Sequence, residues 1–509
     1  MKTWRLKYLS ISDLSEQNPW WKGKALVESD QLIVTWEKSS FKWRPRIVET
    51  FQWDANVIYS LRGPRQVGKT TLIKLKVREL LRKGVDGRRI FYWACDQVDS
   101  FEKLTSIINE YLGWARRFSK DRLYLFLDEV SAVKDWQRSI KYLYDMGKLK
   151  NCLVVLTGSH SLDLVKATES LAGRRGEVDK LVDNIPDKIF LAAKFSEYVE
   201  TRNVDILNVL RSLNLLSTRN RLHVLYSLAE GEIPDSIHEL KPYLKDLEGF
   251  LDDYLITGGI PRAVNSYISR GMIPDVIYSD YVNLILRDIT RWGGNEAYLR
   301  QIILRVIETM SSQVSWNALK DGTEISTHDT ARWYVDILKN NFVVSYIHQL
   351  NRDKGVPYYR KAKKIYFEDP FIFHALKWWT FGSGSPFDES LDFLKDSENK
   401  SKLIESVVCN HLIRLLFNMK PSPQFEYITK LFYWESSKKR EVDFVAKMET
   451  AFLPIELKYQ SSIRRSDAYG IIDFLKGGKT HKGIIITKDV FVQRRSYIGI
   501  PTSILLLLI

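Results

Sequence analysis

Short, nearly continuous apolar runs alternate with longer amphipathic stretches between residues 56 and 194. The runs occupy residues 57–61, 89–94, 123–127, 152–156 and 188–192. Such runs predict parallel strands that are buried on both faces, and the amphipathic stretches between them predict helices. The pattern therefore predicts an α/β fold with a parallel sheet. The preceding residues, 1–55, are rich in tryptophan, and we expect them to pack on this domain.

The pattern changes several times after residue 194. Apolar positions at helical spacing predict a mainly helical region over residues 195–295. Residues 296–379 read as helices followed by two strands, 342–350 and 364–367, which is the order of a winged helix. A polar stretch with glycines and a proline predicts a linker over 380–402. Residues 403–509 predict helix, three strands, helix and strand, ending in an apolar strand at 504–508.

Length and composition narrow the class of protein. The chain has 509 residues, which predicts three or four domains at about 100–200 residues each. Hydrophobic residues make up 45 % and charged residues 27 %, so a chain disordered throughout is excluded. The 76 Lys and Arg exceed the 62 Asp and Glu, giving a net charge of +14. This balance favours a polyanionic partner, nucleic acid first and an anionic membrane second. A basic surface that serves only solubility is the alternative.

The sequence carries no signal for a membrane or for export. Its longest apolar run, 504–509, has six residues, whereas a membrane-spanning helix needs roughly 18. The first residues lack the apolar core of a signal peptide. Cys95, Cys152 and Cys409 are too widely spaced for a disulfide framework or a zinc site. We therefore expect no membrane contact, a cytoplasmic location and buried, reduced cysteines.

Residues 63–70 fit the pattern Gly-x-x-x-x-Gly-Lys-Thr between a predicted strand and a predicted helix. This is a P-loop, whose backbone N–H groups and helix N-terminus bind phosphates. Lys69 would bind the β- and γ-phosphates, and the Thr70 hydroxyl would ligate Mg²⁺. The pattern predicts binding of ATP with Mg²⁺ by Gly63, Pro64, Arg65, Gln66, Val67, Gly68, Lys69, Thr70 and Thr71.

Polar residues end the predicted strands 123–127 and 152–156. Asp128 would hold Mg²⁺ through water, and Glu129 would orient or deprotonate the attacking water as the catalytic base. A solvated strand end is the alternative. The strand at 152–156 ends in Thr-Gly-Ser, and a small polar side chain there would lie between Asp128 and the γ-phosphate. We assign this nucleotide-sensing role to Ser159, with Thr157 as the alternative.

Taken together, these motifs resemble the archaeal AAA+ ATPase family. The resemblance rests on residues 63–71, 127–130 with Asp135 and Trp136, 157–159, the Gly-Arg-Arg-Gly at 173–176 and the Gly-Gly-Ile-Pro at 258–261. It covers nearly the whole chain, less securely in 1–50. It implies an AAA+-type P-loop core (56–194), a helical lid (195–295), a winged helix (296–379) and, after the linker, a nuclease-like domain (403–509).

The resemblance also implies roles for three arginines. Arg174 or Arg175 would lie at the subunit edge and complete the ATP site of a neighbouring copy in a homo-oligomer. A guanidinium suits this task because it spreads positive charge over the γ-phosphate oxygens. A surface-loop arginine is the alternative. Arg262, which follows Gly-Gly-Ile-Pro, would contact the bound nucleotide from the helical lid.

A second set of polar residues is similar to the PD-(D/E)xK nuclease signature, typical of restriction-endonuclease-like α/β domains. Asp443 lies on one predicted strand, and Glu456 and Lys458 lie on the next. The two-residue period of a strand puts Glu456 and Lys458 on one face, beside Asp443. Glu405, on the preceding helix, would join both carboxylates in binding Mg²⁺ or Mn²⁺, while Lys458 would act on the attacking water. A solvated charged strand is the alternative.

Basic residues near this second site and on the winged helix predict contacts with DNA, mainly with its phosphate backbone. The assigned basic residues are Arg332, Lys354, Lys438, Lys439, Arg440, Arg464 and Arg465, and the polar Gln460, two residues beyond Lys458, is assigned with them. The hairpin expected to form the wing adds Arg352, Arg360, Lys361, Lys363 and Lys364. Solvated charged loops, or a winged helix that binds protein, are the alternatives.

Three functions follow from these patterns. The leading hypothesis is an ATP-hydrolysing enzyme that binds and remodels duplex or branched DNA and cleaves it with its C-terminal domain. The second is a nucleotide-dependent DNA-binding switch with an inactive nuclease-like domain. The third is a signalling NTPase that binds protein.

Overall fold

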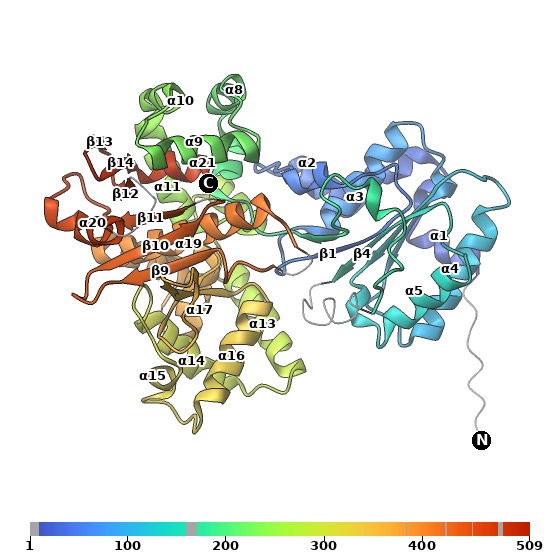
Figure 1. Cartoon of the computed structure of the whole chain (residues 1–509). Coiled ribbons are helices and arrows are strands. Elements are labelled where there is room, and N and C mark those ends of the chain that lie inside the picture. Colours follow the sequence, from blue (N-terminus) through green and yellow to red (C-terminus); the bar gives the residue numbers. More distant parts are fainter. Residues whose placement is uncertain (1–9, 159–169, 383, 423–424, 450, 477–481) are drawn as a thin grey trace. The chain divides into compact units, whose positions relative to one another are not determined.

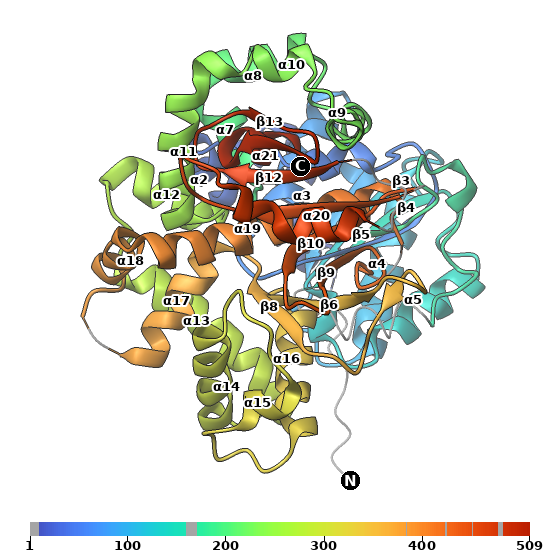
Figure 2. The ribbon, with the colours of Figure 1, turned by 60° about the vertical axis from the view of Figure 1, so that its left-hand side comes forward.

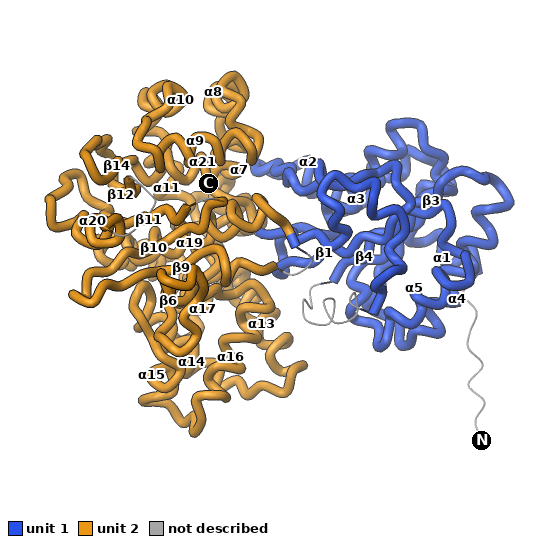
Figure 3. Tube along the Cα trace, in the orientation of Figure 1, with its two compact units in different colours: residues 1–191, 422–424 blue, residues 192–421, 425–509 orange. Residues whose placement is uncertain are grey.

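The computed structural model describes residues 10–158, 170–382, 384–422, 425–449, 451–476 and 482–509 (Figure 1). The chain forms two compact units (Figure 3). The first comprises residues 1–191 and 422–424, and the second comprises residues 192–421 and 425–509. Within the described ranges, none of the helices is both long enough and apolar enough to span a membrane.

A parallel sheet of five strands forms the centre of the first unit, in the order β2-β3-β4-β1-β5. The strands are β1 (Ile58–Arg62), β2 (Ile90–Ala94), β3 (Leu123–Asp128), β4 (Cys152–Gly158) and β5 (Asp187–Ile189). Every residue of β1, β3 and β4 is buried, as expected for strands covered on both faces. The parallel sheet predicted from the apolar runs is confirmed.

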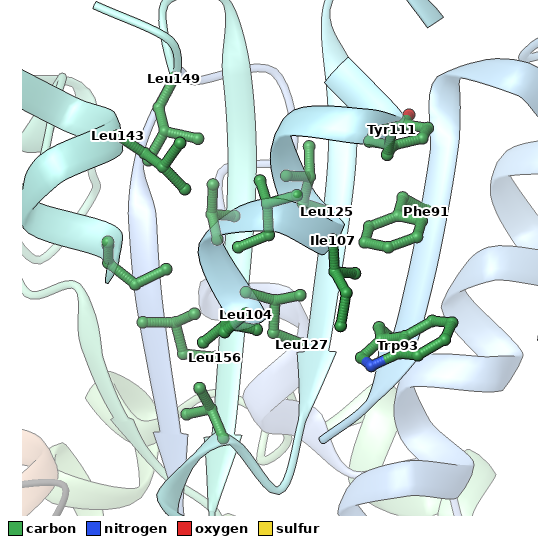
Figure 4. Close-up of a cluster of buried hydrophobic side chains, with 14 of the residues drawn as sticks. Phe91, Trp93, Leu104, Ile107, Tyr111, Leu125, Leu127, Leu143, Leu149 and Leu156 are labelled. Atoms are coloured by element: carbon green, nitrogen blue, oxygen red, sulfur yellow. The ribbon is translucent and has the colours of Figure 1, made fainter. Parts of the chain in front are cut away.

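Among the described residues, three helices connect these strands, and two of them supply one side of the core. They are α3 (Lys69–Arg82), α4 (Phe101–Ala115) and α5 (Trp136–Asp145). Figure 4 shows side chains from β2, β3 and β4 packed against α4 and α5, among them Phe91, Leu125, Leu127, Leu156, Leu104, Ile107 and Leu143. Burying each such side chain contributes roughly 1.5–3 kcal/mol. Cys95 and Cys152 belong to this cluster, and all three cysteines are buried and free, as predicted.

The tryptophan-rich N-terminal segment protects the open edge of this sheet. It contains α1 (Ile11–Glu16) and α2 (Gln31–Lys38). Asn18 hydrogen-bonds both backbone groups of Tyr92, accepting from its N–H (2.7 Å) and donating to its carbonyl (2.9 Å). The indoles of Trp20 and Trp21 both donate to the carbonyl of Ile90. These side chains satisfy edge groups of β2 that would otherwise invite pairing with another strand.

The second unit begins with helices and continues into a mixed region. Its helices are α7 (Phe195–Arg202), α8 (Val204–Ser212), α9 (Thr218–Glu230), α10 (Asp235–His238), α11 (Leu244–Thr257), α12 (Pro261–Arg270), α13 (Asp275–Arg291), α14 (Glu296–Glu308), α15 (Trp316–Lys320), α16 (His328–Asn340), α17 (Pro370–Phe381), α18 (Pro386–Lys395), α19 (Ser397–Met419), α20 (Tyr469–Leu475) and α21 (Thr502–Leu508). The predominantly helical character predicted for residues 195–295 is confirmed.

A nine-stranded sheet forms the centre of the second unit, in the order β13-β14-β12-β11-β10-β9-β6-β7, with β8 paired to β6. The strands are β6 (Val344–Asn351), β7 (Val356–Pro357), β8 (Lys363–Phe367), β9 (Leu431–Glu435), β10 (Glu441–Lys447), β11 (Phe452–Leu457), β12 (Gly483–Thr487), β13 (Val492–Gln493) and β14 (Tyr497–Pro501). Strands β10 and β11 are antiparallel and Phe444 pairs with Ile455. This register sets Asp443 opposite Glu456.

The hairpin expected to form the wing of a winged helix is part of this large sheet (Figure 2). Strands β6 and β8 pair antiparallel, as predicted. However, β6 also pairs with β9, through His348 with Phe432 and Gln349 with Tyr433. Because the apolar residues of β6 are buried on both faces, this hairpin extends the C-terminal sheet instead of standing free in solvent.

Two further expectations are corrected by the second unit. Residues 380–402, expected as a linker, are largely helical, because the polar residues act as helix caps: Ser385 caps α18 and Asp396 caps α19. Residues 504–508, expected as a strand, belong to helix α21. A short run of apolar residues fits a buried helix as well as a buried strand, and every residue of α21 is buried.

Candidate functional site

The phosphate-binding loop lies between β1 and α3, and its backbone geometry requires glycine at residues 63 and 68. Gly68 caps α3 with φ of 96°, a left-handed conformation that glycine adopts without strain. A Cβ on Gly63 would lie 1.9 Å from the carbonyl oxygen of Phe190. The loop therefore passes so close to the chain leaving β5 that only glycine fits at residue 63.

Lys69 and Thr70 form the first turn of α3. The buried Lys69 ammonium donates to the carbonyls of Gly63 (2.9 Å) and Pro64 (2.8 Å), both at the start of its own loop. Positive charge and helix N–H groups thus gather at the N-terminus of α3, where phosphate groups bind favourably.

Asp128 ends β3 and is held by side chains from both neighbouring strands. The Tyr92 hydroxyl donates to Asp128 Oδ2 (3.0 Å), and the Thr157 hydroxyl donates to Asp128 Oδ1. Thr157 also accepts from the backbone N–H of Glu129 (3.0 Å). Ser159 lies outside the described residues, and Thr157, the alternative, occupies the position beside Asp128.

The backbone and the charges at this edge are unusual. Glu129 has φ of 51°, an uncommon conformation for a non-glycine residue and one that clusters at functional sites. Burial, with the charges of Glu129 and Asp128, raises the pKa of Asp96, which follows β2. Burial and the charge of Asp128 also raise the pKa of Tyr92. Asp96, Asp128 and Glu129 place three carboxylates at or just after the carboxyl ends of β2 and β3, where parallel sheets place their ligands.

The donor set at this edge fits Mg²⁺. The Thr70 hydroxyl and the Asp128 carboxylate are hard oxygen ligands, which this ion prefers. When bound with a nucleotide, the ion would neutralise charge on the phosphate oxygens. Sequence reasoning missed Tyr92 and Asp96, although Tyr92 lies within the apolar run that forms β2 and Asp96 lies two residues beyond its end.

The three arginines assigned from the resemblance have different surroundings. Arg174 is partly exposed and pairs with Asp145 of its own chain (2.6 Å). Arg175 is buried, donating to the carbonyl of Ile58 (3.0 Å) and to Asp187 (2.6 Å). It joins β1 to β5 from inside the first unit, so we withdraw its assignment to a neighbouring ATP site.

Arg262 lies in the second unit, in the first turn of α12. It is exposed, and its guanidinium pairs with Asp280 of α13 (2.7 Å).

The residues of the nuclease-like signature come together in the second unit. Leu457 N–H donates to Asp443 Oδ2 (3.0 Å), and Asp443 N–H donates to Glu456 Oε2 (3.3 Å). Lys458 pairs with Glu456 (2.6 Å). Glu405 reaches the cluster from α19, which packs on β8, β9 and β10. The strand period and the preceding helix therefore place these four residues as expected.

One member of the cluster was expected elsewhere. Lys364 of β8 was assigned to an exposed basic wing, but its side chain is only 1 % exposed. Its ammonium lies 2.9 Å from Asp443 Oδ1 and 3.3 Å from Glu405 Oε1, and it also pairs with Glu441. The assignment failed because β8 joins the large sheet, so its alternate residues face the carboxylates.

Burial and the two lysines set the pKa values of the cluster. Burial raises the pKa of Glu456 to about 8 and that of Glu405 to about 7. Burial would also raise the pKa of Asp443, but the charges of Lys364 and Lys458 outweigh it and hold this pKa below its ordinary value. Across the described ranges, no group of three or more His, Cys, Asp or Glu side chains is arranged to hold a metal ion.

Most residues assigned to DNA lie on the surface. Seven are exposed: Arg332, Lys354, Lys438, Lys439, Gln460, Arg464 and Arg465. Arg440 is partly buried and pairs with Asp473 (2.9 Å). In the hairpin, Arg360 and Lys361 are exposed, whereas Lys363 and Lys364 are buried and are not available to a phosphate backbone.

Three family models match separate parts of the chain. Residues 55–181 match an AAA domain, residues 249–382 match a domain of unknown function (DUF8612), and residues 400–505 match another (DUF4143). The first match, together with the parallel sheet and the P-loop, identifies a P-loop ATPase domain in the first unit.

Two curated relatives are similar over most of their length. The uncharacterized protein MJ1637 of Methanocaldococcus jannaschii is 23 % identical over 475 residues, covering 91 % of this chain and 87 % of the relative. An uncharacterized protein of Haemophilus influenzae is 20 % identical over 453 residues, covering 86 % and 91 %.

Solved structures give weaker likenesses. The Aeropyrum pernix ORC1 protein in complex with DNA is 14 % identical, covering 74 % of this chain and 98 % of that one, with a TM-score of 0.29. A Thermotoga maritima RuvB variant is 17 % identical, covering 64 % and 89 %, with a TM-score of 0.25. TM-scores at this level do not establish a shared fold.

Proposed function

We propose that the chain hydrolyses ATP and couples the nucleotide state to DNA binding by the second unit, without cutting the DNA. The observation that carries the ATPase is the Asp128–Glu129 pair at the end of β3. There, Tyr92 and Thr157 fix the Asp128 carboxylate. Lys69 and Thr70 would bind the phosphates and Mg²⁺, and Glu129 would activate water.

The ATPase is tested with two substitutions that separate binding from hydrolysis. Lys69→Ala removes the cation that binds the phosphates, so ATP binding is lost. Glu129→Gln keeps the size of the side chain but cannot take a proton, so ATP is bound and hydrolysed slowly. Binding is measured with a fluorescent ATP analogue and hydrolysis by phosphate release. Wild-type turnover in Glu129→Gln would remove Glu129 from the mechanism.

DNA binding is supported by the net charge of +14 and by the exposed Lys438, Lys439, Arg464 and Arg465, which follow β9 and β11. Binding of duplex, single-stranded and four-way-junction DNA is measured with and without ATP. Lys69→Ala is the control for nucleotide dependence. If no DNA structure binds under any condition, the NTPase that acts on protein takes the place of this proposal.

Cleavage, the other activity expected from the nuclease-like signature, is not part of the proposal. It needs a metal ion among carboxylates that here pair with lysine ammonium groups. The same DNA substrates, incubated with Mn²⁺ and ATP, should remain intact. Cleavage that disappears in Asp443→Ala would restore the nuclease hypothesis.

A further inference from the structure

A lysine from a distant hairpin lies inside the carboxylate cluster of the second unit. Lys364 of β8 pairs with three carboxylates from two other elements, Glu405 of α19 and Glu441 and Asp443 of β10. Its 1 % exposed side chain has no exit to solvent. A buried ammonium is costly unless it is paired, and three carboxylates meet that requirement.

The backbone holds Lys364 in this position. Lys364 pairs with Ile347 across the β6–β8 ladder, and β6 is itself paired with β9. Its neighbour Lys363 lies on the opposite side of the strand, with its ammonium 4.9 Å from the centre of the Trp316 ring. The hairpin therefore cannot slide by one residue without exchanging the two lysines.

The oxygens that a metal ion would need already have partners. Both oxygens of Asp443 are used, one by Lys364 and one by the N–H of Leu457 (3.0 Å). Glu441 is shared between Lys364 and the amide of Gln313 (2.6 Å). The remaining two carboxylates have donors as well, since Tyr366 donates to Glu405 (2.7 Å) and Lys458 to Glu456 (2.6 Å).

This donor set does not fit a resident divalent cation. Mg²⁺ needs several carboxylate or water oxygens at about 2.0–2.1 Å in an octahedral shell. The ammonium of Lys364 occupies the space between the same oxygens, and its charge repels a second cation. The ammonium already compensates the charge of the surrounding carboxylates, so the cluster needs no metal ion.

We propose that Lys364 is a built-in counter-ion that takes the place of a metal ion in the nuclease-like domain. The chain as it stands therefore binds no Mg²⁺ or Mn²⁺ at Asp443 and Glu456. Removing the ammonium opens a divalent-cation site there. The inference deepens the non-cleaving part of the proposed function and is independent of ATP hydrolysis.

The test counts bound Mn²⁺ per chain by electron paramagnetic resonance, on the full chain without nucleotide. A Thr70→Ala parent removes the P-loop contribution. We expect no bound Mn²⁺ in this parent and one bound Mn²⁺ when Lys364→Met is added, because the methionine side chain has a similar length to that of lysine but carries no charge. Adding Asp443→Asn to that variant should remove the bound ion. Lys361→Met, on the exposed turn of the same hairpin, is the matched control and should bind none.

A second measurement follows folding. Lys364→Met leaves Glu405, Glu441 and Asp443 without their shared cation, so its Tm should fall, and Mn²⁺ should raise it again in Lys364→Met but not in the parent. Two results overturn the proposal. One is a folded Lys364→Met chain that binds no Mn²⁺.

The other is Mn²⁺ bound by the parent, with or without DNA, and lost in Asp443→Asn. This second result needs no Lys364 variant, so it decides the question even if Lys364→Met does not fold. ATP hydrolysis by Lys364→Met with Thr70 intact is measured separately. If neither Lys364→Met nor wild type hydrolyses ATP, the P-loop proposal is contradicted and the proposal for Lys364 is not affected.

Discussion

Tyr92 and Asp128 connect the N-terminal segment to the ATP site through one hydrogen bond of 3.0 Å. The ammonium of Lys74 lies 3.5 Å from the centre of the Tyr92 ring. Lys74 also pairs with Asp30, the N-cap of α2, at 3.1 Å. The backbone of Tyr92 is bound by Asn18. Residues 10–55 thus help to set the position of the Asp128 carboxylate.

Tyr92→Phe should therefore slow ATP hydrolysis. The substitution removes one charge-assisted hydrogen bond to Asp128 and keeps the ring under Lys74. Such a bond contributes about 1.5–3 kcal/mol, so kcat should fall by roughly tenfold or more while the affinity for ATP changes little. Steady-state phosphate release measures it, with the exposed Tyr142→Phe of α5 as control. An unchanged kcat would mean that the carboxylate is positioned without Tyr92.

Gly63 offers a test of the close packing around the P-loop. Gly63→Ala would put a Cβ 1.9 Å from the Phe190 carbonyl oxygen, so backbone must shift. Its free energy of unfolding should fall by about 2 kcal/mol or more, as overpacking does. The matched control is Gly113→Ala in α4, where no atom beyond the adjacent residues and the helix's own backbone lies within 4 Å of the new Cβ. That change should stabilise by up to about 1 kcal/mol. Denaturant titration measures both, and equal effects would contradict the structural reason given for Gly63.

Arg174 and Arg175 are neighbours in sequence with opposite expected phenotypes. Arg175→Ala leaves Asp187 without its buried partner and should cost about 3 kcal/mol of stability. If Arg174 completes the site of a neighbouring copy, Arg174→Ala should keep its Tm and its ATP binding but lose hydrolysis.

Mixing Arg174→Ala with Lys69→Ala should then restore part of the activity, because some interfaces regain both parts. Full activity of Arg174→Ala, or a wild-type enzyme that is active as a monomer, would exclude the role in trans.

Buried histidines should make the second unit sensitive to acid. Burial lowers the pKa of His374 from its ordinary 6.5 to about 4. The unfolded chain therefore binds more protons between these values, so stability is complete above pH 6.5 and is lost as the pH falls toward 4. The loss is on the order of 3 kcal/mol for this residue.

The pH dependence is read as a difference between variants. His374→Gln keeps a donor for the carbonyl of Leu255, which contacts the ring at 2.9 Å, but does not titrate. Its Tm should fall less than that of wild type between pH 7 and pH 5. The exposed His328→Gln should behave as wild type. Parallel curves for His374→Gln and wild type would contradict the prediction.

Local patterns predicted the first unit better than the second. The strands at 58–62 and 123–128 fall on the nearly continuous apolar runs 57–61 and 123–127, and the P-loop residues are contiguous, so a short window of sequence contains each of them. Asp443, Glu456 and Lys458 were also found, since the two-residue strand period puts Glu456 and Lys458 on one face and Asp443 lies on the neighbouring strand.

What failed depended on partners distant in sequence. Lys364 was predicted as one of several basic residues of the wing hairpin, and only the pairing of β6 with β9 brings it to Asp443. Arg175 stands beside Arg174 in sequence, but in the structure Arg175 is buried and paired with Asp187. Asp396 was assigned to a linker because the polar residue types that cap helices are the same types that occur in loops.

The last prediction concerns the exposed arginines after β11. Arg464 and Arg465 are exposed. Each phosphate that a cation neutralises makes the slope of log K against log salt more negative by about 0.9. Replacing both by alanine should weaken binding of every DNA structure. It should also make the slope of log K against log salt less negative by roughly 2. The charge-matched control replaces Lys395 and Lys402, which pair with Asp392 and Glu398 on helices α18 and α19. Binding is measured by fluorescence anisotropy at several salt concentrations. Equal losses in both double variants would show that net charge, and not a defined surface beside β11, attracts the DNA.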